Sequence, residues 1–175
     1  MTLHRMGDYC AEHLAIAHRT ELVRVSSEIV IDAPLLSVLP FVDALDAYPS
    51  WMTLVHQAKL VDNCLDQWNV ELRARVGPLA RSKRLLMKKT VSEVSEGSRS
   101  AQIVFERRET DGRQHAQWTL TIDLKTLESS SSTRVDVELF YDGGLWTAGI
   151  LERVLADSIS SGRDRLRHIV TSSSR

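Results

Sequence analysis

Apolar and polar residues alternate over several stretches of the chain, and this alternation predicts β-strands. From Trp68 to Val76 every second residue is apolar, and the residues between them are polar or charged. Because successive side chains of a strand point to opposite faces, one face of this strand is buried and the other is wet. Comparable stretches separated by turn residues predict strands over residues 21–32, 53–62, 67–76, 81–91, 101–108, 114–124 and 133–141.

Two other segments have the spacing of apolar residues that is typical of helices. The first covers residues 34–51 and begins with Pro34, whose missing N–H and fixed φ suit the first turn of a helix. Pro40 lies inside this segment and removes a backbone hydrogen bond, so we expect a kink or two short helices. The second segment follows Gly143-Gly144 and continues for about 26 residues, to the region of Val170.

The order of these elements predicts an α+β fold with one domain over residues 21–171. Short connections between successive strands imply antiparallel pairing, and a sheet with one apolar face must be covered. We therefore expect a seven-stranded antiparallel sheet covered by the long C-terminal helix, with two short helices after the first strand. Residues 1–20 are expected to be an N-terminal extension that can form a helix, and residues 172–175 a disordered tail.

The sequence Asp32-Ala33-Pro34, an apolar helical segment and then Tyr48-Pro49-Ser50-Trp51 follow the first predicted strand. This order resembles the SRPBCC superfamily, the START-like or helix-grip proteins that include polyketide cyclases, coenzyme Q-binding proteins and lipid-transfer domains. The resemblance extends over roughly residues 22–171. It implies a curved sheet that wraps around the C-terminal helix, with a cavity for a hydrophobic ligand between them.

The resemblance leaves three functions open. The first is intracellular binding or transport of a small hydrophobic molecule, such as a lipid, isoprenoid, quinone or polyketide. The second is a polyketide cyclase/dehydratase-like enzyme, which would need at least two polar groups converging in the pocket. The third is a module that binds a protein partner, and a pocket filled by side chains would favour it. We expect binding rather than catalysis.

Charge and composition argue against several other functions. The formal net charge is −1, so the chain lacks the excess of basic residues that nucleic acid binding demands. No segment has the length of apolar sequence that spans a membrane, and the first twenty residues lack the apolar core of a secretory signal. The only cysteines are Cys10 and Cys64, too few for a disulfide scaffold. We therefore expect a location in the reducing cytoplasm.

Motifs for cofactor or metal chemistry are also missing from the sequence. It has no glycine-rich phosphate loop with its lysine, no serine nucleophile elbow and no helical histidine pair with an intervening glutamate. A set of potential soft-metal ligands near the N-terminus matches no regular zinc spacing: His4, Cys10, His13 and His18. We expect no metal and no cofactor, and we assign no catalytic residue.

Strand parity selects the residues expected to face the ligand. Arg107 is in phase with Ile103 and Phe105, and His56 is in phase with Leu54 and Ala58, so Arg107 and His56 are the best polar anchors. Lys83, in phase with Leu85 and Met87, can reach the cavity from a strand end. The full set of expected ligand contacts is Trp51, His56, Trp68, Leu72, Phe105, Arg107, Trp118, Leu155, Ser158 and Gly162.

The inward stripe of the C-terminal helix has small residues at its centre. Ser158 and Gly162 lie one turn apart between leucines, and Gly in a helix interior costs about 1 kcal/mol relative to Ala. Two explanations remain open: the small residues leave space for a ligand, or Gly162 lets another segment approach the helix backbone closely.

Overall fold

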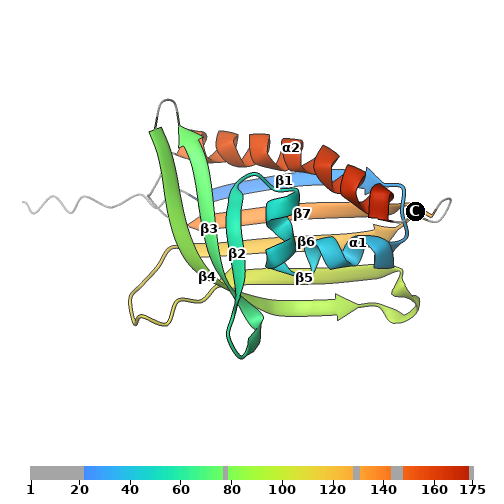
Figure 1. The fold of residues 1–175 in the computed structure, drawn as a ribbon, viewed down its shortest axis with the longest axis horizontal. Coiled ribbons are helices and arrows are strands. Elements are labelled where there is room, and N and C mark those ends of the chain that lie inside the picture. Colours follow the sequence, from blue (N-terminus) through green and yellow to red (C-terminus); the bar gives the residue numbers. More distant parts are fainter. Residues whose placement is uncertain (1–21, 77–78, 128–130, 143–147, 174–175) are drawn as a thin grey trace, which may run out of the picture.

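A computed structural model describes residues 22–76, 79–127, 131–142 and 148–173. In this part of the chain seven strands form one antiparallel sheet in the order β1-β7-β6-β5-β4-β3-β2 (Figure 1). The strands are β1 (Leu22–Ile31), β2 (Val55–Val61), β3 (Cys64–Val76), β4 (Leu79–Val94), β5 (Ser100–Arg107), β6 (Gln117–Thr126) and β7 (Thr133–Asp142). The predicted fold class is confirmed. Neighbours in the sheet are neighbours in sequence, except that β1 pairs with β7.

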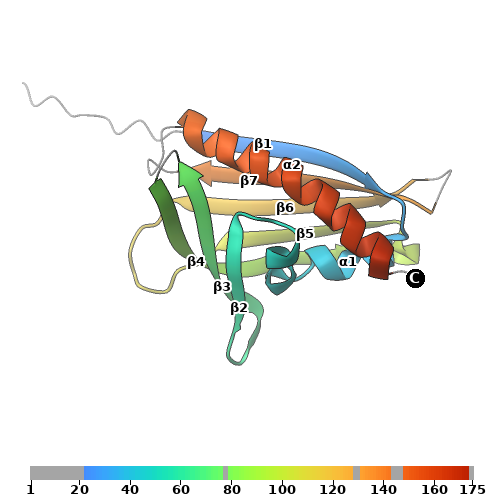
Figure 2. The same ribbon diagram turned by 45° about the horizontal axis from the view of Figure 1, so that its top comes forward.

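Helical segments lie after β1 and after β7. Helix α1 (Leu35–Val42) and the 3₁₀ helix η1 (Leu45–Ser50) carry the chain from β1 at one sheet edge to β2 at the other, and a second 3₁₀ turn, η2 (Glu96–Ser98), joins β4 to β5. Helix α2 (Ala148–Ser173) runs beside β1 on the same side of the curved sheet as α1 (Figures 1 and 2). The chain therefore has the predicted arrangement of a sheet curved around a long C-terminal helix.

The two short helices predicted from the prolines are present, with shifted boundaries. Pro34 is the N-cap of α1 rather than its first residue, and α1 continues past Pro40 to end at Val42. The second segment is a 3₁₀ helix that contains Pro49. The predicted extension at residues 1–20 lies outside the described residues, and α2 continues to Ser173, two residues into the predicted tail.

Polar contacts anchor the turn between β1 and α1. The buried Thr133 hydroxyl donates to the Ala33 carbonyl oxygen at 2.8 Å, and the Ser132 hydroxyl donates to Asp32 Oδ1 at 2.9 Å. Thr133 is the first residue of β7, the strand that pairs with β1, and Ser132 directly precedes it. The Asp32-Ala33-Pro34 segment is thus held to the sheet before α1 turns across its concave face.

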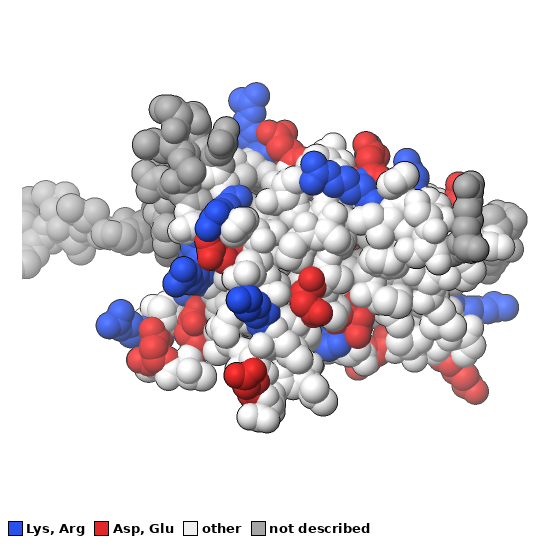
Figure 3. Space-filling view, viewed as in Figure 1, with Lys and Arg blue, Asp and Glu red and all other residues white. Residues whose placement is uncertain are grey.

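The hydrophobic core fills the space between the sheet and the helices. Alternate residues of β6 and β7 are buried, as the period of two predicts, and the largest fully buried side chains include Tyr48, Phe105 and Tyr141. On the face seen in Figure 3, basic and acidic side chains of the described residues are interspersed. Exposed ion pairs such as Lys88–Asp66 contribute little stability, since both partners remain solvated.

Candidate ligand cavity and its polar end

An apolar cavity lies between the concave face of the sheet, η1 and α2. Its wall is formed by Leu45, Tyr48, Met52, Leu54, Val55, Val70, Leu72, Leu85, Met87, Trp118, Leu120, Val137, Leu139, Ser158 and Ile159. The cavity has a volume of about 50 Å³, which is room for about four water molecules. Pockets for drug-sized ligands typically measure about 300–1,000 Å³. A ligand of that size therefore requires the wall to move.

Three of the predicted ligand contacts lie in the cavity wall. Leu72 on β3, Trp118 on β6 and Ser158 on α2 face the cavity from three sides. Leu72 and Trp118 were predicted from strand parity, and Ser158 was predicted because it is a small residue in the inward stripe of the helix. Contact with a ligand stays a prediction for each of them. The side chain of Leu155 lies outside the described residues.

Three predicted aromatic contacts instead pack behind the cavity wall. Phe105 makes edge-to-face contacts with Trp68 and Tyr48, at centroid distances of 5.6 and 6.2 Å. The indole N–H of Trp68 donates to Asp46 Oδ1 at 2.8 Å, and that of Trp51 donates to the Phe41 carbonyl oxygen at 3.0 Å. These contacts hold η1 and α1 on the sheet, so the three aromatic side chains support the wall rather than form it.

Tyr48 is part of the wall, but its hydroxyl group is engaged within the protein. It donates to the Val42 carbonyl oxygen at 3.0 Å. Burial raises the pKa of the Tyr48 phenol far above its ordinary value of 10, and the negative charge of Asp43 adds to this effect. Tyr48 is therefore a neutral structural residue and not a proton donor for a bound ligand.

The predicted inward orientation of His56 is wrong. Its side chain is exposed, whereas Val55 and Ala58 on the same strand are buried. The pairing of β2 with β3 shifts register between Val55 and Gln57, which is the signature of a β-bulge. The extra residue breaks the period of two at His56, so parity counted from Leu54 assigns it to the wrong face.

Gly162 does not border the cavity, because it packs against Trp51. A Cβ atom at position 162 would lie 3.1 Å from the Trp51 carbonyl oxygen and 3.3 Å from its Cε3 atom. Such distances are tighter than ordinary van der Waals contact. These distances support the second explanation for this glycine, that it lets the end of η1 approach the backbone of α2. Contact of Gly162 with a ligand stays a prediction.

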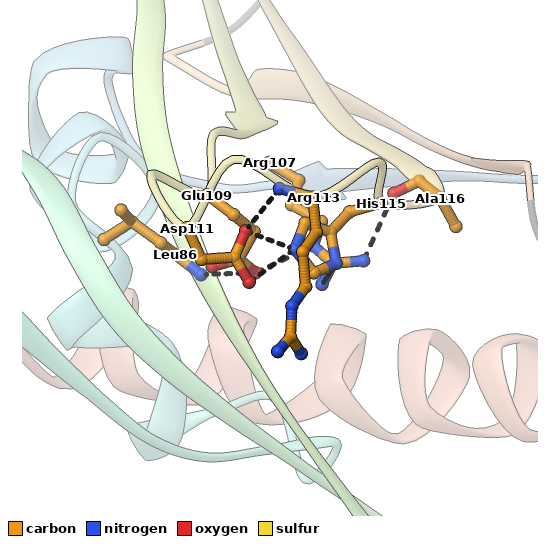
Figure 4. Close-up of polar contacts among 7 residues, drawn as sticks. All are labelled: Leu86, Arg107, Glu109, Asp111, Arg113, His115 and Ala116. Carbon is orange, nitrogen blue, oxygen red and sulfur yellow. Dashed lines mark hydrogen bonds and ion pairs between the residues drawn. The ribbon is translucent and has the colours of Figure 1, made fainter.

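Arg107 points inward as predicted, but the protein itself uses its donors (Figure 4). Nε donates to Glu109 Oε1 at 2.8 Å, Nη1 donates to the Ala116 carbonyl oxygen at 3.3 Å, and Nη2 lies 3.0 Å from His115 Nδ1. His115 Nε2 in turn lies 2.8 Å from Asp111 Oδ1. Arg107 therefore ties the connection between β5 and β6 to the end of the sheet.

Lys83 is a partly buried cation at this end of the sheet, and it has no anionic partner in contact among the described residues. It lies directly opposite Leu72 in the β3–β4 pair, so it shares the cavity face. Its Nζ atom is buried without a hydrogen-bond partner and lies 5.6 and 5.0 Å from the ring centroids of Trp118 and Tyr141. Burial, and then the positive charge of Arg107, lower the pKa of Lys83 to about 8, against a smaller opposing effect of Glu109.

Within the described residues, no group of three or more His, Cys, Asp and Glu side chains is arranged to hold a metal ion. No described helix combines the length and apolar character needed to cross a membrane.

Comparison with known proteins identifies the fold. No protein-family model and no curated protein matches the chain. A START superfamily protein from Mycobacterium smegmatis is similar in structure, with a TM-score of 0.64 at 14% identity over 86% of this chain and 98% of that one. Human StAR-related lipid transfer protein 5 gives a TM-score of 0.66 at 10% identity, over 87% and 77% of the two chains. An aromatase/cyclase from a Streptomyces species gives 0.63 at 11% identity, over 89% and 97%.

Identities this low show the fold alone. Taken with the strand order and the C-terminal helix, they show that this chain has the START-like, helix-grip fold.

Proposed function

We propose that the chain binds a small hydrophobic molecule, such as a lipid, isoprenoid, quinone or polyketide, between the sheet and α2. The observation that carries this proposal is the cavity itself, whose wall is almost entirely apolar and which lies where sheet, η1 and α2 meet. Such a wall favours apolar ligands because it offers them burial without unpaired polar groups. The fold is shared with a lipid transfer protein and with an aromatase/cyclase, which supports a ligand-binding role.

Binding requires the cavity to expand beyond its volume of about 50 Å³. Met52 and Met87 in the wall are unbranched and can adopt other rotamers at low cost. The described part of α2 contributes only Ser158 and Ile159 to the wall, so a small displacement of the helix would enlarge the cavity without breaking sheet hydrogen bonds. The ligand then stabilises the expanded state through its own apolar contacts.

Binding without chemistry fits the polar groups better than a cyclase activity does. An acid–base reaction needs two groups that converge on the substrate. Of the two polar anchors predicted from the sequence, His56 is exposed and Arg107 is occupied by Glu109, His115 and Ala116. We further propose a cytoplasmic location, which the presence of only two cysteines in 175 residues supports.

The small cavity favours a second function, a module that binds a protein partner through its surface. The two functions are separated by titration with an environment-sensitive apolar dye and by native mass spectrometry of the purified protein. In the titration, a hydrophobic-ligand binder takes up about one dye equivalent per chain and releases it to long-chain or polycyclic competitors. In native mass spectrometry, it retains a hydrophobic adduct. The absence of a stoichiometric, competable site would reject the ligand-binding proposal.

A matched pair of variants locates the dye site. Ser158→Leu places a large side chain in the cavity wall, whereas Ser161→Leu places the same side chain on the exposed side of α2. We expect Ser158→Leu to weaken dye binding at least tenfold and Ser161→Leu to leave it unchanged. Equal effects of the two substitutions would place the dye elsewhere.

A further inference from the structure

Lys83 lies next to the apolar cavity, because several of its neighbours are residues of the cavity wall. Leu72, its direct cross-strand partner, and Leu85, two residues further along β4, both face the cavity. Trp118 faces the cavity as well, and its ring centroid lies 5.6 Å from Lys83 Nζ. A group bound beside Trp118 and Leu72 is therefore within reach of the ammonium group.

The ammonium group of Lys83 lacks the acceptors that a buried cation needs. Its Nζ is buried, makes no hydrogen bond to the protein, and is stabilised by the faces of the Trp118 and Tyr141 rings. An ammonium group carries three donors, and ring contacts replace its hydration only in part. An oxygen anion would supply the missing acceptor.

The charges around Lys83 determine what charge a ligand group bound to its Nζ atom should carry. Three charges act on one another here: the positive Lys83 and Arg107 and the negative Glu109. Glu109 is in contact with Arg107, with 2.8 Å between Nε and Oε1, and its Oε1 also accepts the backbone N–H of Leu86 at 3.2 Å. Arg107 and Glu109 compensate each other, so the remaining formal charge is that of Lys83. One carboxylate neutralises it.

We propose that the ligand is an amphipathic carboxylate whose apolar body occupies the cavity and whose carboxylate binds Lys83 Nζ. This inference rests on the proposed ligand-binding function and specifies the ligand class of the same site. Lys83 takes the anchoring role that strand parity assigns to Arg107. The distinction between the two cations arises because the β5–β6 connection supplies acceptors to Arg107 and none to Lys83.

The test compares carboxylates with alcohols of equal chain length, by calorimetry at pH 7. Octanoate and octan-1-ol are the first pair, and pairs from six to twelve carbons follow to find the length that the cavity accepts. A charge-assisted hydrogen bond is worth about 1.5–3 kcal/mol, so we expect the carboxylate to bind about 10- to 100-fold more tightly than the alcohol. Lys83→Met should abolish this preference and leave the alcohol affinity within about twofold, because Met keeps the apolar bulk.

The control is Lys88→Met, the same substitution on the outward face of β4, where the ammonium group is exposed and paired with Asp66. It should retain the carboxylate preference. Lys83→Gln keeps a hydrogen-bond donor without the charge and replaces Lys83→Met if that variant does not fold. We expect it to lose the preference as well.

The possible failures are distinguishable. Equal affinities for octanoate and octan-1-ol in the wild-type protein would overturn the Lys83 inference and leave hydrophobic binding intact. A preference that persists in Lys83→Met or Lys83→Gln would also overturn it. If no chain length binds and no dye site exists, the proposed function itself fails, and the inference fails with it.

Discussion

Replacing Lys83 by Met should make the unliganded protein more stable at neutral pH. The reason is the buried Nζ atom, which is removed from water without gaining a hydrogen bond. Desolvation of this kind disfavours the charged form of the side chain. Met fills a similar volume with apolar atoms, and it has no charge to desolvate.

The magnitude follows from the lowered pKa of Lys83. The pKa falls from an ordinary 10.5 to about 8, and at about 1.4 kcal/mol per pKa unit this difference sets an upper limit of about 3.5 kcal/mol. The side chain is only partly buried, so solvent screening reduces the cost to about half. Loss of the ring contacts in the variant offsets some of the gain, at about 0.5–1 kcal/mol. The net expectation is a gain of about 1 kcal/mol, or about 2–4 °C in Tm for a chain of this size.

The effect should depend on pH in one direction. Below pH 8, Lys83 is protonated in both the folded and the unfolded protein, so the desolvation cost is fully present. Between about pH 8 and 10.5 the unfolded chain binds the proton more strongly than the folded protein does, and the stability of the wild type therefore rises with pH. The advantage of Lys83→Met should be largest at pH 7 and should disappear above pH 10.5.

Urea unfolding of the wild type, Lys83→Met and the exposed control Lys88→Met at pH 7, 8.5 and 10 measures these differences. A Lys83→Met protein that is less stable than the wild type at pH 7 would refute the reasoning. So would a stability difference that is the same at all three pH values, since it would show that the charge of Lys83 is not the cause.

Two further substitutions test the packing that positions the cavity. Gly162→Leu should lower the free energy of unfolding by roughly 1–3 kcal/mol, because the new Cβ lies only 3.1 Å from the Trp51 carbonyl oxygen. The exposed control Ser161→Leu should change the free energy of unfolding by less than about 0.5 kcal/mol. Thermal melts that rank the two variants equally would exclude close packing at Gly162. Thr133→Val keeps the shape of a buried residue but removes its hydrogen bond to Ala33, and should cost about 1–3 kcal/mol in chemical unfolding; an unchanged midpoint would show that this bond does not anchor the turn.

The sequence predicted the fold well because the relevant signals are periodic and local. Alternation along β6 and β7 continues without interruption, so parity assigns Trp118 and Leu120 correctly to the inner face. The same rule fails at His56, because the β-bulge between Val55 and Gln57 inserts an extra residue. No residue type in that stretch marks the bulge, since it arises from the way β2 pairs with β3.

Residue type and parity are also insufficient to separate a ligand anchor from a structural cation. Lys83 and Arg107 are both inward-facing and both follow from strand parity. Their difference depends on Glu109, His115 and the Ala116 carbonyl group, all of which lie in the β5–β6 connection or at its end and have no periodic pattern. The geometry of an irregular loop thus decides which of two equivalent positions is left without acceptors.

The same loop explains how a cavity with an apolar wall can hold a charged group next to it. If Arg107 were unpaired, two cations would face the cavity end, and their mutual repulsion would add to the desolvation cost of Lys83. Glu109 neutralises the charge of Arg107 through their contact, and the negative charge of Glu109 also favours the protonated form of Lys83. Glu109 thus offsets part of the effect of Arg107 without occupying the ammonium group, and with a pKa of about 8 Lys83 stays mostly protonated at neutral pH. A functional group that is charged, buried and without an acceptor reduces stability, and proteins commonly retain such a group where a ligand completes it.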